Sequence, residues 1–194
     1  IMPMPEDEAT WADLQIIFAT KNGNIRRNQL SDFTNIRQNG KIAMKLNETD
    51  ELVSVLPCND KDNILLATRL GKAIRFDVND VRVFVGRGSS GVRGVRLKPK
   101  DIVVSMSLIP DIQEKYVLSV TENGFGKRTP VDDYRKTNRG GQGVANIECS
   151  TRNGPVVASY VASESDQIML VTNSGKLIRI RVNGGEGDTI RIAG

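Results

Sequence analysis

Four arginines recur at the same place in a repeated motif. In each copy a Thr stands three residues before a Gly, and an Arg follows four residues after that Gly; the arginines are Arg27, Arg75, Arg128 and Arg179. A guanidinium forms paired hydrogen bonds with phosphate oxygens and stays charged at physiological pH. Arginines repeated in this way predict binding to a polyanion through its phosphates, a contact that carries no sequence information.

Further cations lie in glycine-rich stretches between the motifs. Residues 69–100 contain nine Lys and Arg against two Asp, and both "GRGSSGVRGVR" and "NRGGQG" flank an arginine with glycine. Glycine lets a backbone approach a phosphate closely and leaves its amide free to donate. Aromatic residues make up only 5% of the chain, which favours duplex DNA over a stacked single strand. The candidate DNA-binding residues are Arg26, Arg27, Arg75, Arg87, Arg93, Arg96, Lys127, Arg128, Arg135, Arg139, Lys176 and Arg179.

Two interpretations of the repeated arginines are open. Side chains alternate between the two faces of a strand, so the apolar Ile25, Ile74 and Ile178 are expected to face inward and the arginines outward. Alternatively, each arginine pairs with a carboxylate of its own repeat and pins a loop; the candidate carboxylates are Asp32, Asp77 and Asp132.

The elements that position these residues repeat about every fifty residues. The motif glycines are Gly23, Gly71, Gly124 and Gly175, at intervals of 48, 53 and 51 residues. Each motif follows a short apolar run, and no stretch has helical periodicity, so the chain is predicted to be all-β. Four short strands in each unit, with glycine turns, favour a β-pinwheel or propeller-like array of four-stranded blades. Such blades must stack on their neighbours to bury a core.

The predicted organisation is a single bladed fragment over residues 1–194. Its approximate units are 1–50 (partial), 51–101, 102–155 and 156–194 (truncated), or roughly four blades. Because the last unit stops before its pattern is complete, we expect the chain to be a piece of a longer protein.

The remaining chemistry of the sequence is sparse. Histidine is absent, the two cysteines are far apart, and there is no G-x-x-x-x-G-K-[ST] nucleotide-binding motif. We therefore expect no catalytic residue, no metal site and no cofactor in this chain, which is not an enzyme on its own. Two distant cysteines predict free thiols of a cytosolic protein. No apolar run approaches the roughly 20 residues of a membrane span.

Three long strings resemble the C-terminal domain of the A subunits of DNA gyrases, and the resemblance runs from about Leu14 to Gly194. They are "GKAIRFDVNDVRVFVGRGSSGVRGVRL", "TENGFGKRTPVDDYRKTNRGGQGVANI" and "IMLVTNSGKLIRIRV". The resemblance implies a β-pinwheel with six blades in the full domain. It further implies that duplex DNA wraps around a basic outer edge and that this wrap sets the handedness of the crossing used for negative supercoiling.

The same resemblance implies partners and a location. These are double-stranded DNA, the rest of the gyrase A subunit and the gyrase B subunit in an A2B2 holoenzyme, in bacterial cytoplasm at the nucleoid. ATP and Mg would act in other domains of that topoisomerase. The family's Gln-Arg-Arg-Gly-Gly-x-Gly box is not intact here, since "NRGGQG" at Asn138–Gly143 departs from it. Two alternatives stay open: the equivalent domain of topoisomerase IV, and a β-propeller scaffold that binds protein.

Overall fold

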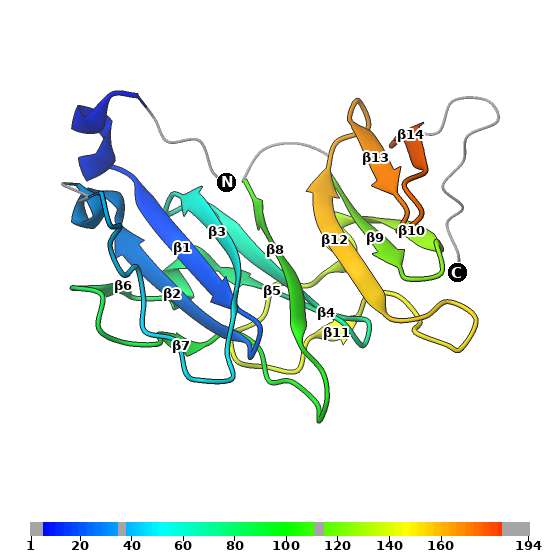
Figure 1. Ribbon diagram of the computed structural model, residues 1–194, viewed down its shortest axis with the longest axis horizontal. Helices are drawn as coiled ribbons and strands as arrows, with labels where there is room; N and C mark the ends of the chain where they lie inside the picture. Colours follow the sequence, from blue (N-terminus) through cyan, green and yellow to red (C-terminus); the bar gives the residue numbers. More distant parts are fainter. Residues whose placement is uncertain (1–5, 35–37, 111–114, 184–194) are drawn as a thin grey trace.

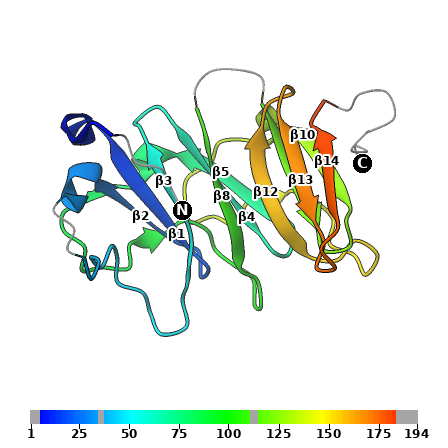
Figure 2. The same cartoon turned by 45° about the horizontal axis from the view of Figure 1, so that its top comes forward.

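A computed structural model describes residues 6–34, 38–110 and 115–183. Within these ranges fourteen strands form four sheets, with four short 3-10 helices between them. The sheets follow one another along the long axis of the molecule like tilted blades (Figures 1 and 2). The expectation of an all-β, bladed fold is confirmed.

Each sheet is built around one hairpin. The hairpins are β1 (Gln15–Thr20) with β2 (Asn24–Gln29), β4 (Asn63–Thr68) with β5 (Lys72–Asp77), β9 (Tyr116–Thr121) with β10 (Gly126–Pro130), and β13 (Gln167–Val171) with β14 (Leu177–Arg181). The 3-10 helices η2 (Leu30–Phe33), η3 (Val78–Asp80) and η4 (Val131–Asp133) follow the first three hairpins, and η1 (Glu8–Ala12) precedes the first.

The repeated Thr and Gly form the hairpin turn. Gly23 has φ +83° and Gly71 has φ +79°, a left-handed conformation that glycine adopts without steric cost. The Gly23 N–H donates to the Thr20 carbonyl at 3.0 Å, and the Thr20 hydroxyl accepts from the Asn24 N–H at 3.2 Å. The Gly71 N–H donates to the Thr68 carbonyl at 3.1 Å in the same way. The Thr-x-x-Gly spacing is therefore explained by turn geometry.

The edge strands of the first three sheets come from the sequence that follows each hairpin. In the first sheet β3 (Leu52–Cys58) pairs with β1, while β6 (Val83–Phe84) and β7 (Val92–Arg93) pair with β2. In the second, β8 (Val103–Ile109) pairs with β4 and β11 (Val144–Ala145) with β5. In the third, β12 (Val156–Ala162) pairs with β9. Neighbouring blades are therefore interlocked by strand exchange.

The exchanged outer strands approach the hairpins closely. Gly91 (φ +86°) precedes β7, and a Cβ added there would collide with the carbonyl of Ile25. Gly143 (φ +71°) precedes β11, and a Cβ added there would collide with the carbonyl of Ala73. Both glycines are required because the exchanged strand crosses directly over the backbone of the preceding blade.

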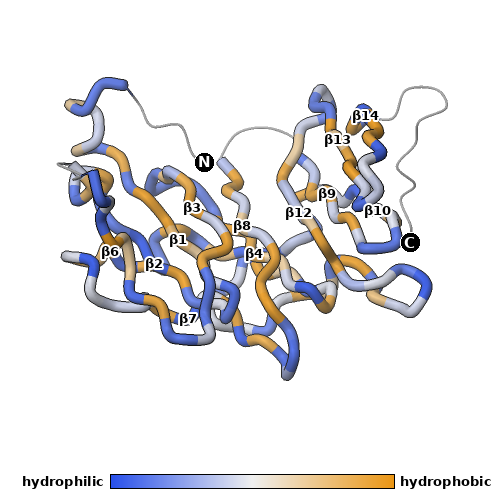
Figure 3. Tube along the Cα trace, in the orientation of Figure 1, coloured by the Kyte–Doolittle hydropathy of each residue, from blue (hydrophilic) through white to orange (hydrophobic). Residues whose placement is uncertain are grey.

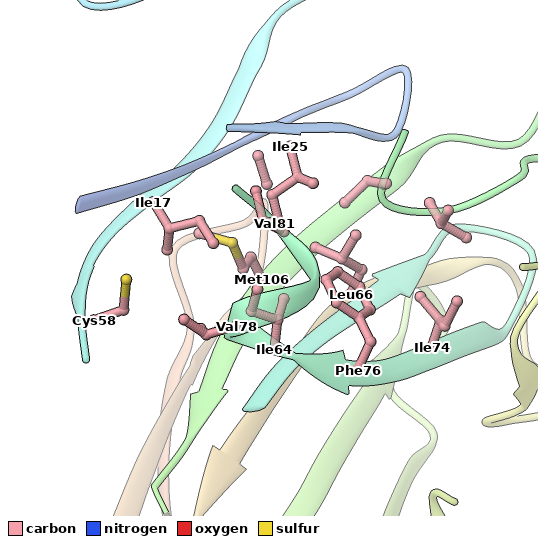
Figure 4. Packing of buried hydrophobic residues seen from close by; sticks show 13 residues of the cluster. Ile17, Ile25, Cys58, Ile64, Leu66, Ile74, Phe76, Val78, Val81 and Met106 are labelled. Atoms are coloured by element: carbon pink, nitrogen blue, oxygen red, sulfur yellow. The ribbon is translucent and has the colours of Figure 1, made fainter. Parts of the chain in front are cut away.

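The main core lies between the first two blades. Ile17 and Ile25 of the first hairpin pack with Ile64, Leu66 and Ile74 of the second, and all five are almost fully buried (Figure 4). The apolar residues follow the central strands, whereas hydrophilic residues gather in the connections (Figure 3). Both faces of a central blade are thus covered by protein.

A second cluster covers the other face of the first blade. Trp11 of η1 and the η2 residues Leu30 and Phe33 pack against Ile16 and Phe18 of β1. β3, β8 and β12, which we call the inner strands, lie side by side: β8 contacts both β3 and β12. Figure 1 shows β3, β8 and β12 one after another along the middle of the array, and β6, β7 and β11 lie at the opposite edges of the first two sheets.

Both cysteines are free thiols, as the sequence predicts. Cys58 is buried in the main core, and burial raises its pKa to about 12. Cys149 is partly exposed, and its pKa is also raised by burial. No helix in the described ranges is long and apolar enough to cross a membrane.

We predict that Gly91→Ala lowers the free energy of unfolding by more than about 3 kcal/mol, because a left-handed strain is added to a backbone collision. Gly40 is the matched control: its φ is +80°, and nothing lies within 4 Å of an added Cβ. Gly40→Ala should cost only about 1–2 kcal/mol. Urea unfolding followed by circular dichroism measures both, and equal losses would contradict the close approach of the exchanged strand.

Candidate nucleic-acid interface

Arg75, one of the repeated arginines, is anchored in the next blade. Its Nη1 donates to the carbonyl of Val131 at 3.2 Å and to that of Tyr134 at 3.4 Å, and its Nε donates to Asn63 Oδ1 at 3.1 Å. The same Nη1 lies 3.8 Å from the carboxylate of Asp132. The guanidinium therefore connects the second hairpin to η4 of the third blade.

Arg128 repeats this arrangement one blade further on. Its Nη1 donates to the carbonyl of Val182 at 2.8 Å, and Val182 occupies the same place after its motif glycine as Val131 does. The Arg128 guanidinium lies 4.6 Å from the centre of the Tyr116 ring, and Glu164 is 3.8 Å away. Carbonyl, ring and carboxylate together hold it between two blades.

Arg27 makes the corresponding link between the first and second blades. Its side chain is only 6% exposed, and Nη1 bonds to Asp60 Oδ1 at 3.0 Å and to Asn79 Oδ1 at 3.3 Å. Asn79 lies in η3 of the second blade, and Asp60 lies in the turn that joins β3 of the first sheet to β4 of the second. Three of the four repeated arginines are thus inter-blade anchors.

The expectation that the repeated arginines face outward is consequently wrong for Arg27, Arg75 and Arg128. The strand-alternation argument assumed one face toward solvent, but here the neighbouring blade covers that face. The alternative of pairing within one repeat is corrected as well, since Asp132 lies beside Arg75 of the preceding blade. Arg179, in β14, is exposed.

Arg26 is also buried. Its Nε bonds to Asn28 Oδ1 at 2.7 Å, and its guanidinium donates to the carbonyls of Gly86 and Ser89. It lies 5.1 Å from the centre of the Phe84 ring, and burial lowers its pKa. Arg26 fastens the loop between β6 and β7 to the first blade, so it is not accessible to a phosphate.

Other candidates fasten loops while remaining partly exposed. Arg139 donates from Nε to the carbonyl of Asp80 at 2.7 Å and from Nη1 to that of Arg93 at 3.0 Å. Arg87 donates to the carbonyl of Ile42 at 2.6 Å. These arginines hold the glycine-rich loops in place. Lys127, in β10, is partly buried.

Three of the five exposed candidates lie on two stretches, which we name the outer segments: residues 82–96 and 135–145. They carry β6, β7 and β11 and contain no Asp or Glu. Sequence reasoning did not select Arg82, which is exposed and stacks 4.2 Å from the centre of the Phe84 ring; its only signal was its place in the cation-rich stretch. Exposed candidates of the outer segments are Arg93, Arg96 and Arg135, and those of the last hairpin are Lys176 and Arg179.

Tandem hairpins whose sheets are completed by strands of the following repeat define a propeller-like blade array. The chain matches the family described as "DNA gyrase C-terminal domain, beta-propeller" over residues 15–59, 62–110, 115–154 and 166–184. It belongs to that family. The resemblance noted from the sequence is therefore confirmed.

Individual relatives agree with this assignment. The chain is 40% identical to the DNA gyrase A subunit of Rickettsia bellii, over 100% of this chain and 26% of that protein, so it spans about a quarter of the relative. The C-terminal domain of DNA topoisomerase IV has a TM-score of 0.82 at 26% identity, covering 88% of this chain and 53% of that one. The DNA gyrase A C-terminal domain has a TM-score of 0.79 at 30% identity, covering 89% and 57%.

We predict that Arg75→Ala lowers the free energy of unfolding by about 1–3 kcal/mol, because charge-assisted hydrogen bonds to the next blade are lost. Arg93→Ala, which removes an exposed arginine of β7, should change it by less than about 0.5 kcal/mol. Thermal and urea unfolding of both variants provides the measurement. A neutral Arg75→Ala would show that the anchor does not hold the blades together.

Proposed function

We propose that this chain is a non-catalytic module of a type II topoisomerase, DNA gyrase, that binds duplex DNA and bends it along the outer segments. One observation carries the proposal: the two outer segments are tied to their sheets by β6, β7 and β11, contain no Asp or Glu, and expose Arg82, Arg93, Arg96 and Arg135. Membership of the DNA gyrase C-terminal domain family supports it.

Binding would occur through the phosphate backbone. Each phosphate neutralised by Lys or Arg releases counterions, which supplies affinity without base readout. Bending a 20–30 bp site by 40–90° costs about 1–6 kcal/mol, so several contacts along the arc must offset it. Arginines on successive blades provide such a series because each outer segment lies on a different sheet.

We assign the phosphate contacts to those cations whose side chains are exposed. Arg82, Arg93 and Arg96 of the first outer segment and Arg135 of the second are the principal phosphate contacts, with Lys176 and Arg179 extending them on the last hairpin. In this proposal Arg27, Arg75 and Arg128 do not contact DNA. They fix how one blade sits against the next, and thereby the spacing of the outer cations.

The proposed partner subunits and location are inferred from the family to which the chain belongs. The chain would act beside the rest of the gyrase A subunit and the gyrase B subunit in an A2B2 enzyme, in bacterial cytoplasm at the nucleoid. There the bent duplex would fix the handedness of the crossing, while ATP and Mg act in other domains.

A second candidate is the equivalent domain of topoisomerase IV, favoured by the TM-score of 0.82 with that protein's C-terminal domain. The two candidates share backbone binding but differ in how far the duplex is wrapped. Ligation of nicked circular DNA in the presence of the chain separates them, because constrained writhe shifts the topoisomer distribution only if DNA is wrapped.

We predict that duplex affinity falls steeply with salt and that the triple variant Arg82→Ala, Arg93→Ala, Arg96→Ala reduces the slope of log Kobs against log salt by about 2.7, or about 0.9 for each lost contact. Fluorescence anisotropy with a labelled duplex measures both slopes. The control removes three exposed cations outside the outer segments: Lys61→Ala, Arg69→Ala, Arg152→Ala. Wild-type affinity in the Arg82, Arg93, Arg96 variant, or an equal loss in the control, would contradict the proposed interface.

A further inference from the structure

Val85 is a fully exposed apolar side chain on the first outer segment. Its relative exposure is 101%, whereas the other exposed large hydrophobic residues in the described ranges reach at most 76%. It lies in the loop between β6 and β7, directly after the buried Phe84. An isolated exposed valine needs no explanation in itself; what distinguishes Val85 is how it is held.

The backbone on both sides of Val85 is fixed. The Asn28 side-chain amide donates to the carbonyl of Phe84 at 3.0 Å and to that of Gly86 at 2.9 Å, and Arg26 also donates to Gly86. The guanidiniums of Arg26 and Arg82 both lie over the Phe84 ring. Val85 therefore cannot fold back into the core, and the loop is already ordered before any ligand binds.

The surroundings of Val85 favour a nucleic-acid groove over a protein surface. Along the chain, Arg82 precedes it and Arg87 follows it, and residues 81–100 contain six Lys and Arg with no carboxylate. The Asp32 carboxylate accepts from the Asn28 amide at 3.1 Å beneath this loop. Many proteins that bind the minor groove insert an apolar side chain between base steps and place Arg or Lys in the groove as well. A rigid valine between two arginines matches that chemistry.

We propose that Val85 is an apolar wedge that enters the minor groove of a bound duplex and promotes its bend at the first outer segment. This inference rests on the proposed DNA binding and adds a residue whose contribution is not electrostatic. Partial unstacking at one base step would concentrate the bend there, while the exposed Arg82 binds an adjacent phosphate and Arg87, bonded to the Ile42 carbonyl, keeps the loop in place.

The second outer segment differs at the corresponding position. β6 runs parallel to β2, with Val83 opposite Arg27, and Lys136 forms the equivalent parallel bridge with Arg75. Counting two residues on from each bridge places Asn138 where Val85 stands. Asn138 is exposed and polar, so it is suited to hydrogen bonds with base edges rather than insertion. The kink is therefore assigned to the first outer segment alone.

The test compares Val85→Ala with Val157→Ala, an exposed valine of the inner strand β12. Bending of a doubly labelled duplex about four helical turns long is measured by fluorescence resonance energy transfer, and affinity by anisotropy over a salt series. We expect Val85→Ala to bind the duplex about tenfold more weakly and to bend it less. The slope of log Kobs against log salt should not change, because the lost contact is apolar. Val157→Ala should behave as wild type, and both variants should give the wild-type circular dichroism spectrum.

The outcomes separate the two proposals. If the wild-type chain binds duplex DNA with a steep salt dependence but Val85→Ala bends and binds it equally well, the wedge is overturned and the proposed function stands. A loss of bending as large in Val157→Ala also overturns the wedge. If the wild-type chain does not bind duplex DNA, the proposed function itself fails.

Discussion

Strand exchange between consecutive repeats is the constraint on which the rest of this structure depends. A hairpin such as β1–β2 has its sheet completed on both edges by β3, β6 and β7, all of which come from the next repeat. The exchanged segment passes so close to the hairpin backbone that only glycine fits at two of its positions, Gly91 and Gly143. Blades joined in this way cannot slide independently, which gives the outer edge a fixed geometry.

Arginine has two separate roles in this array. Arg27, Arg75 and Arg128 donate to the following blade, two of them to backbone carbonyls, and these contacts hold adjacent sheets together. The outer-segment arginines Arg82 and Arg93 are exposed instead, the first stacked on a phenylalanine ring. In our proposal the first group sets the curvature of the edge and the second group binds the phosphates that follow it.

Much of this fold could be predicted from the sequence, because Thr-x-x-Gly and the alternating apolar runs are local signals. The exchange could not, since β7 and β11 are two residues long and pair with strands distant in sequence. Strand alternation predicted that Arg75 faces outward, because it could not reveal that the next blade covers that face of the sheet. Val85 gave no signal because the apolar run Val83–Val85 suggests a buried strand; its 101% exposure and the hydrogen bonds that fix the backbone on both sides are visible only in the structure.

The division of the arginines into anchors and phosphate contacts is tested most directly by arginine-specific modification with phenylglyoxal, read residue by residue by mass spectrometry, with and without duplex DNA. The account predicts that Arg82, Arg93, Arg96 and Arg135 react in the free chain and are protected by DNA, whereas Arg27, Arg75 and Arg128 react slowly in both states. Protection confined to arginines outside the outer segments, or fast reaction of the anchors, would contradict it.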